Sequence, residues 1–374
     1  MGSRARRGIL ALALCVTGSC RDVGRISEVA PFEWPDGSPR LLTYNVGNDQ
    51  NATWSAAGDS VYYSAAGYPG VPLAPGVLLV APHTGGTVRP VFAFLHSGQV
   101  SEAHHVAPTI SPDGRRIAFF DIVREAAEVE CDAPSTEGSS CPGSQPRLER
   151  AQLVVRDVNE ASSEAAALDV VLPGRGQRVF PPFEENAYPY HELYARDGRI
   201  VFTIAWAPDG ERVAFSDGVG LYVWTPGTDT PVRLPNIEYA LHPTWSPDGE
   251  WLAFMQLAPT ASASIGCTCA DGAVVVRTYH ETDPAMLAVV RPDGSGMRML
   301  GAGQDPSFAP DGTLYAHVAG RIARVDTDTG AATPVPGTDD GYEPALSPDG
   351  RMLAFTRRPD SGGSDVWIVE LDTP

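Results

Sequence analysis

Three side chains that could bind a cation stand at equivalent places in a repeated segment. His242, Asp305 and Glu343 each directly precede a proline that opens one copy of the segment, and His105 lies shortly before another copy. An imidazole and two carboxylates are ligands that one divalent cation in a channel would accept. The simpler interpretation, which we favour, is a solvated polar channel mouth that holds no cofactor.

Aromatic side chains form a second candidate site, between residues 180 and 194. This stretch contains Phe180, Phe183, Tyr188, Tyr190, His191 and Tyr194. Aromatic rings on a backbone stiffened by prolines suit stacking against a sugar ring or burying a peptide. They would equally suit a local cluster that covers the edge of a sheet. The sequence leaves both interpretations open.

The repeated segment is clearest at residues 243–254, which read Pro-Thr-Trp-Ser-Pro-Asp-Gly-Glu-Trp-Leu-Ala-Phe. Pro247 presets φ for a tight turn and Gly249 accepts the left-handed conformation, so the segment predicts a strand, a turn and a second strand. Four further copies lie at residues 108–119, 206–215, 306–316 and 344–355, and a degenerate copy lies at 52–63.

Equivalent positions 54, 110, 206, 245, 308 and 346 are separated by 56, 96, 39, 63 and 38 residues. The shortest spacings are typical of a four-stranded propeller blade. The copies resemble the Pro-x-Trp-Ser-Pro-Asp-Gly repeat of the TolB-type six-bladed β-propeller family, over residues 40–374. The resemblance implies an all-β six-bladed propeller with four-stranded antiparallel blades and a scaffolding role. Related repeats also occur in peptidase-associated domains and in some lyases, so the fold leaves the function open.

Motifs of familiar catalytic chemistry are missing from the sequence. It has no Gly-x-Ser-x-Gly elbow, no His-Glu-x-x-His helix and no phosphate-binding glycine loop. Peptidase propellers carry a hydrolase domain, for which we expect no room after residue 374. The sequence therefore favours a binding protein over an enzyme.

Blade six and the long insertions define the remaining architecture. The last copy is followed by chain for one more strand only, so we expect residues 40–44 to complete blade six and close the ring. Insertions at residues 125–150, 174–200 and 258–284 all fall on the face of the blade-to-blade connections, which we call the inserted face. The Asp-Gly turns lie on the opposite turn face. We expect partners to bind the inserted face, with tolerated loop drift as the alternative.

The N-terminal residues predict export. Three arginines precede a short apolar run and the segment Thr17-Gly18-Ser19-Cys20, which is typical of a signal peptide over residues 1–19. This segment resembles the bacterial lipoprotein cleavage box, which implies a lipid on Cys20, although Thr17 replaces the usual leucine. Residues 20–39 would then form a tether, and the protein would be periplasmic or anchored to the outer membrane.

Four other cysteines are expected to form bonds in an oxidising compartment. Cys131 and Cys141 lie in one insertion, and Cys267 and Cys269 lie in another, so we predict two local disulfides. A zinc site from Cys267, Cys269 and His280 is a less favoured alternative because it lacks a fourth ligand.

The charge of the chain limits its partners. The net charge is −19, so the protein would repel phosphate backbones and we expect no nucleic-acid partner. The sequence predicts a monomeric cell-envelope scaffold that binds a protein or peptide and contacts the membrane through a lipid anchor only. The alternative is a metal-assisted lyase or hydrolase that acts on polysaccharide at the channel mouth.

Overall fold

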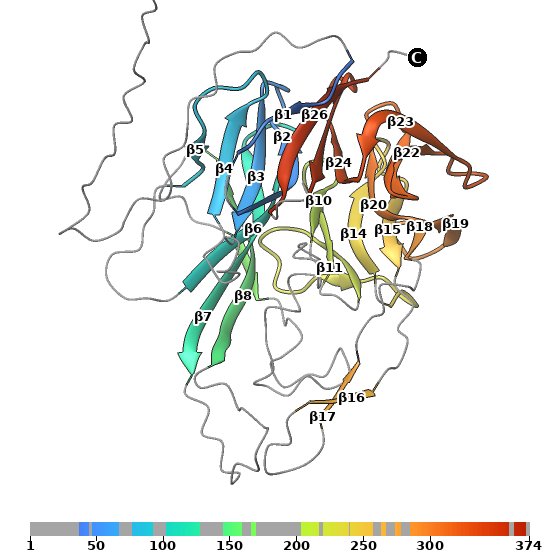
Figure 1. Ribbon diagram of the computed structural model, residues 1–374. Helices are drawn as coiled ribbons and strands as arrows, with labels where there is room; N and C mark the ends of the chain where they lie inside the picture. The colour runs from blue at the N-terminus through green and yellow to red at the C-terminus, as the bar shows by residue number, and fades with distance from the viewer. Residues whose placement is uncertain are drawn as a thin grey trace, which may run out of the picture.

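The computed structural model is a ring of six four-stranded antiparallel sheets (Figure 1). It describes residues 37–44, 47–66, 77–92, 102–127, 145–158, 166–169, 203–216, 220–238, 240–256, 263–266, 274–277, 285–358 and 363–371. The expected six-bladed, all-β fold is confirmed, and this part of the chain contains no helix. A membrane-spanning helix, in particular, is not found among these residues.

Each blade follows the chain outward from the central channel. Blade one consists of β2 (Asn48–Trp54), β3 (Ser60–Ala66), β4 (Val77–Pro82) and β5 (Arg89–Pro90). Blade two consists of β6 (Glu102–Ile110), β7 (Arg116–Ala127), β8 (Gln145–Asp157) and β9 (Ala166–Asp169). Blade three consists of β10 (Ile204–Trp206), β11 (Val213–Ser216), β12 (Leu221–Trp224) and β13 (Val232–Arg233).

The remaining three blades repeat this pattern. Blade four consists of β14 (Ala240–Trp245), β15 (Leu252–Gln256), β18 (Met286–Val290) and β19 (Arg298–Ala302). Blade five consists of β20 (Gln304–Phe308), β21 (Leu314–Val318), β22 (Arg321–Val325) and β23 (Ala332–Asp339). Blade six consists of β24 (Gly341–Leu346), β25 (Met352–Arg357), β26 (Asp365–Glu370) and β1 (Arg40–Leu41).

Strand β1 therefore lies in the same sheet as the last strands of the chain. Arg40 pairs with Ile368 and Leu41 with Trp367, and the amide of Leu42 donates to Val366 O at 2.8 Å. Leu42 is buried in the core between blades six and one. Both ends of the propeller are thus held in one blade.

Two insertions are partly built of strands where we expected loops. β7 continues to Ala127 and β8 begins at Gln145, because the two strands keep pairing beyond the edge of their blade. Within the insertion at 258–284, β16 (Ala263–Gly266) and β17 (Val274–Arg277) form a separate hairpin. Figure 1 shows both features projecting from the same side of the ring.

The Ser-Pro-Asp-Gly turns close by hydrogen bonds within each turn. Gly249 has φ +72°, and its amide donates to Ser246 O at 2.9 Å. The Ser246 hydroxyl donates to Asp248 Oδ1 and accepts from the Trp251 amide at 2.9 Å. The hydrogen bond from Ser246 holds the pKa of Asp248 below its ordinary value. The same contacts recur at Ser111 and Ser347.

The core lies between neighbouring blades. One cluster joins Phe120 and Leu153 of blade two to Trp206 and Trp224 of blade three, and four others likewise join adjacent blades. Trp206 Nε1 also donates to Thr109 O of blade two at 3.1 Å. Because each blade buries its apolar faces against both neighbours, the ring gives the channel rigid walls.

Candidate functional site: the central cavity

One backbone position next to the channel has an unusual conformation in five of the six blades. Asn51, Ala107, His242, Asp305 and Glu343 have φ between 51° and 54°. Each lies in a β-bulge, where the innermost strand has one residue more than its partner strand. A left-handed conformation costs about 1–2 kcal/mol in residues other than glycine, so the surrounding structure must impose it.

These residues and Thr203, their counterpart in blade three, form what we call the throat ring. Its side chains link one blade to the next. The amide of Asn51 donates to Glu343 Oε2 at 2.9 Å, and the amide of Glu343 lies 3.4 Å from Asp305 Oδ2. His242 Nδ1 lies 3.3 Å from Asp305 Oδ1. The bulge turns an amide toward the preceding blade, and an acidic side chain there accepts it.

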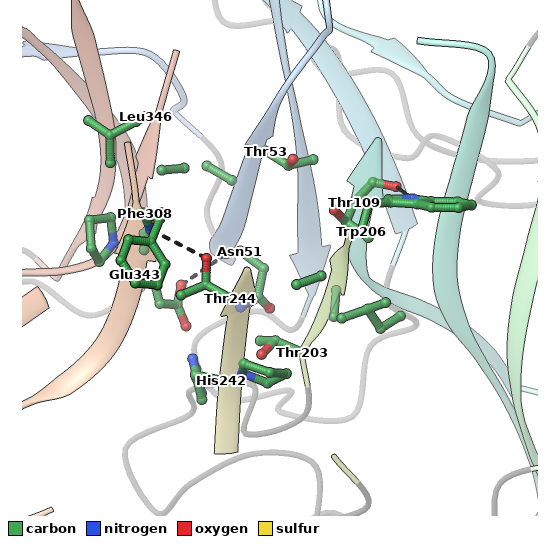
Figure 2. A pocket seen from close by; sticks show the side chains of 18 of the residues that line it. Asn51, Thr53, Thr109, Thr203, Trp206, His242, Thr244, Phe308, Glu343 and Leu346 are labelled. Atoms are coloured by element: carbon green, nitrogen blue, oxygen red, sulfur yellow. Dashed lines mark hydrogen bonds between the residues drawn. The ribbon is translucent and has the colours of Figure 1, made fainter. Parts of the chain in front are cut away.

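The throat ring bounds a cavity of about 380 Å³ that all six blades line. The lining runs along each innermost strand from the throat ring to the last residue before the turn. The cavity therefore extends from the ring toward the turn face. Figure 2 shows Asn51, Thr203, His242 and Glu343 gathered at one end, with Thr53 and Leu346 toward the other.

The walls between the ring and the turns carry small side chains. The second residue of each repeat lines the cavity, and these residues are Thr53, Thr109, Ala205, Thr244, Ser307 and Ala345. The Thr244 hydroxyl of blade four accepts a hydrogen bond from the Phe308 amide of the neighbouring blade five at 3.3 Å. A wall of short side chains leaves the cavity open and presents hydroxyl groups and strand backbone to a ligand.

The throat end of the cavity is acidic and buried. Asp305 is 3% exposed and Glu343 is 6% exposed, and Glu343 Oε2 also accepts from the Thr356 hydroxyl at 2.9 Å. No arginine is among the described residues that line the cavity. Among the described lining residues, His242, paired with Asp305, is the one that can carry a positive charge.

The cation site that the sequence offers as the less favoured alternative stays an untested prediction. His242, Asp305 and Glu343 all line the cavity. Within the described ranges, however, no group of three or more His, Cys, Asp or Glu side chains is arranged to hold a metal ion. The carboxylates instead accept hydrogen bonds from the amides of the throat ring.

Most other predicted site residues lie outside the described part of the chain. These are Phe183, Tyr188, Tyr190, His191, Tyr194, Cys20, Cys131, Cys141, Cys267 and Cys269. His105 belongs to β6 and pairs with Asp121 across the sheet, but its side chain is not described. The disulfides, the lipid anchor and the aromatic site therefore stay predictions.

Sequence reasoning missed the residues that complete the throat ring. Ser64, on β3, accepts the amide of Ala107 at 2.9 Å, and Thr356, on β25, donates to Glu343. Asn51, which precedes the degenerate first copy of the repeat, was not among the candidate residues either. One usable signal was present: the residue before each repeat differs in every blade, whereas the turn residues recur.

A scan of family models and a search of curated protein sequences returned no match. Solved structures similar to this chain include one assigned as TolB from Agrobacterium tumefaciens, with 15% identity over 89% of this chain and 94% of that chain and a TM-score of 0.49. TolB from Acinetobacter baumannii is 15% identical over 80% of this chain and 57% of its own length, with a TM-score of 0.46. An oligogalacturonate lyase in complex with manganese is 11% identical over 91% and 99%, with a TM-score of 0.43. At these scores we base the fold on the strand pairing alone.

Proposed function

We propose that the protein is an exported scaffold of the cell envelope that binds a protein or peptide partner, with a segment of the partner in the central cavity. The observation that carries the proposal is the cavity itself. Its volume of about 380 Å³ lies within the range of about 300–1,000 Å³ found for ligand sites. Six blades form its walls, so the site exists before the partner arrives and little ordering is needed on binding.

The lining favours a peptide segment as the occupant. Thr53, Thr109 and Ser307 bring hydroxyl groups to a wall that is built from the six innermost strands. A peptide presents amide donors and carbonyl acceptors at regular intervals and can pair with such a wall. The acidic throat end provides polar contacts at one end of the segment.

The inserted face is a second contact surface in this proposal. Phe183, Tyr188, Tyr190 and Tyr194 would contact the body of the partner, while the cavity takes an extended segment. The signal peptide and the lipid on Cys20 would place this monomeric propeller at the periplasmic side of a membrane, on a tether of residues 20–39. Both features rest on the sequence.

A cavity-blocking substitution tests the proposal. Ala345 lines the cavity, so Ala345→Phe should fill part of it and weaken capture of envelope peptides by about tenfold, in the range of a binding hot spot. The measurement is binding of a defined peptide pool from an envelope extract to the immobilised mature chain. Ala331→Phe, at an exposed position outside the cavity, is the matched control.

Unchanged capture by Ala345→Phe, with the same thermal midpoint as the parent, would show that the partner does not enter the cavity. Alanine at Tyr188 and Tyr190 tests the inserted face separately. Loss of capture there, with no effect of Ala345→Phe, would move the whole binding site to that face.

A further inference from the structure

We infer that the throat end of the cavity is a receptor for a neutral primary carboxamide, the side-chain amide of an asparagine or glutamine in the bound peptide. The inference rests on the proposed function and names the chemical group that the partner presents there. Three observations support it: a buried side-chain amide whose oxygen has no partner, a hydroxyl group in the same state at the same end of the cavity, and a backbone that holds the amide in place.

The first observation is the side chain of Asn51. This residue lines the cavity and is 8% exposed, and within the described chain its Oδ1 atom has no hydrogen-bond partner. The hydrogen bond from Asn51 to Glu343 comes from the backbone amide, so it does not use the side chain. A buried polar atom without a partner is unfavourable, so a ligand that donates to Asn51 Oδ1 gains affinity.

The second observation is the hydroxyl group of Thr203. Its Oγ1 atom is also buried with no partner among the described residues, and Figure 2 shows Thr203 at the same end of the cavity as Asn51. Asn51 belongs to blade one and Thr203 to blade three. The throat end thus offers two oxygen atoms, from two blades, to a ligand that carries two N–H donors.

The chemistry of the Asn51 side chain selects the ligand group. A carboxamide has two N–H donors and a carbonyl acceptor, so a second carboxamide can return both kinds of hydrogen bond. A carboxylate brings no donor and an ammonium group brings no acceptor, so each would satisfy only one half of the Asn51 side chain. A hydroxyl group donates a single hydrogen, which cannot serve both Asn51 and Thr203. The primary amide alone of these groups meets all the needs of the site.

A primary amide also fits better than the backbone amide of the peptide. A trans peptide bond holds its N–H and its C=O on opposite edges, so it cannot form both hydrogen bonds with one side-chain amide. A primary amide has one N–H on the same edge as its C=O and a second N–H on another edge. It can therefore pair with Asn51 through the first edge and donate to Thr203 through the second.

The third observation is that the backbone of Asn51 is fixed to the neighbouring blade six. Its amide donates to Glu343 Oε2 at 2.9 Å, and Trp54 Nε1, on the same strand, donates to Ala345 O at 2.9 Å. Asn51 has φ 52°, which asparagine tolerates better than most residues. The side-chain amide therefore starts from a fixed backbone before the ligand arrives, and little ordering opposes binding.

One orphaned donor among the lining residues has a different explanation. Within the described ranges, Trp245 Nε1 is buried without a partner. Trp54 and Trp206, at equivalent positions, each donate to a carbonyl of the preceding blade, at 2.9 and 3.1 Å. The Trp245 indole therefore belongs to this row of contacts between blades, on the turn side of the cavity and not at its throat end.

The test uses four tripeptides as probes, in which two alanines flank a central glutamine, glutamate, lysine or methionine. Acetyl and N-methylamide ends leave the glutamine side chain as the only primary amide. The cavity tryptophans, Trp54, Trp206 and Trp245, report binding to the mature chain by fluorescence. The glutamine peptide should bind about tenfold more tightly than the methionine peptide, whose side chain has similar length and no N–H donor. It should also bind more tightly than the glutamate and lysine peptides.

Asn51→Gly tests the side-chain amide itself. Glycine accepts the positive φ and keeps the backbone amide that binds Glu343, so the substitution removes the side chain alone. The preference for glutamine over methionine should fall to about twofold, while the methionine peptide binds as before.

Thr203→Val provides a second comparison in a chain with the original Asn51. Valine has nearly the same shape and lacks the hydroxyl, so the preference for glutamine should fall about threefold. Asn236→Gly is the matched control, since Asn236 also has positive φ (60°) but lies exposed in a turn and does not line the cavity. It should leave the affinities for all four tripeptides unchanged.

Equal binding of the four tripeptides, or no binding of the glutamine peptide, would overturn the inference. Tighter binding of the glutamate or lysine peptide would also overturn it, because the throat would then recognise a charge. So would an unchanged preference for glutamine in Asn51→Gly and Thr203→Val. These failures differ from failure of the proposed function. Peptide capture that is lost in Ala345→Phe would still place a peptide in the cavity even if all four tripeptides bind equally.

Discussion

The turn face and the throat ring both repeat around the propeller, yet they use the repeat in opposite ways. At the turns the same residues return: Ser111, Ser246 and Ser347 each bind an aspartate two residues later. In the throat ring the backbone conformation returns but the side chain changes from blade to blade. Equal geometry with unequal chemistry is what a site for an asymmetric ligand requires.

Hydrogen bonding shows the same difference. Each turn satisfies its own polar groups, and the Ser246 hydroxyl alone serves both Asp248 and the amide of Trp251. The throat ring makes hydrogen bonds across blade boundaries, from the amides of Asn51 and Glu343 to the preceding blade, and the Asn51 Oδ1 and Thr203 Oγ1 atoms have no partner. The turns therefore stabilise single blades, whereas the throat ring joins neighbouring blades.

The largest expected effect comes from removing the carboxylate that joins blades six and one. Glu343→Ala leaves the Asn51 amide and the Thr356 hydroxyl without their acceptor in a buried site, so the free energy of unfolding should fall by about 3 kcal/mol. Urea unfolding measures it. Glu343→Gln, which keeps an acceptor oxygen, should lose less. Equal stability of Glu343→Ala and the parent would show that the ring does not join the blades.

A turn glycine should have the next largest effect. In Gly249→Ala the residue keeps φ +72° and its new Cβ would lie 3.2 Å from Pro208 Cγ of the neighbouring turn, so we expect a loss of about 2 kcal/mol. Gly312→Ala has φ +89° and open space, and should show the backbone cost alone. Thermal unfolding of the two variants would separate the cost of the contact with Pro208 from the cost of the backbone conformation. Equal losses of stability would mean that the contact with the neighbouring turn costs nothing.

The turn hydroxyl should matter less. Ser246→Ala removes one donor to Asp248 and one acceptor for the Trp251 amide, so the free energy of unfolding should fall by about 1 kcal/mol. Because the Ser246 hydroxyl is the main cause of the lowered pKa of Asp248, that pKa should move back up toward its ordinary value. An NMR titration of Asp248 would detect the change. A shift at Asp349 as well would contradict the independence of the turns.

The last prediction concerns the pH dependence of stability that comes from a buried acid outside the throat ring. Asp365, beside β1, is outside the ring, and burial raises its pKa from 3.8 to about 6 against the opposing hydrogen bond from Thr43. The folded chain therefore binds more protons than the unfolded chain between these values, and stability from this group falls as pH rises through the window. Asp365→Asn should flatten that slope. Urea midpoints at pH 4.5 and pH 7 measure it; an unchanged slope would assign the effect to other groups.

Most of the fold could be predicted from the repeat, because the conformation of each turn depends on its own residues. Pro247, Asp248 and Gly249 determine a hairpin without help from the rest of the chain, so six copies predict six blades. Strand lengths beyond the repeat were not predictable. The extensions of β7 and β8 depend on pairing between residues near Arg124 and Leu148, whose sequence has no turn signal next to it.

Only part of the candidate site could be predicted from the sequence. The position before each repeat could be placed at the channel, which brought His242, Asp305 and Glu343 together as candidates. Their role could not be deduced, since a β-bulge that turns the Asn51 amide toward Glu343 is a three-dimensional feature of two neighbouring blades. The cavity on the turn side of the ring likewise follows from how six strands pack, and no single segment encodes it.

The pairing of β1 with β26 sets an order of events in the biogenesis of the protein. Thr43 and Asp365, which meet at this junction, are 322 residues apart in the chain. Bringing such distant ends together costs about 5 kcal/mol of chain entropy. Residues 40–42 therefore stay without their partner strand until β26 has been synthesised. If the protein is exported as proposed, a chain that cannot close its ring early would remain competent to cross a membrane in extended form, and would close the ring after release on the far side.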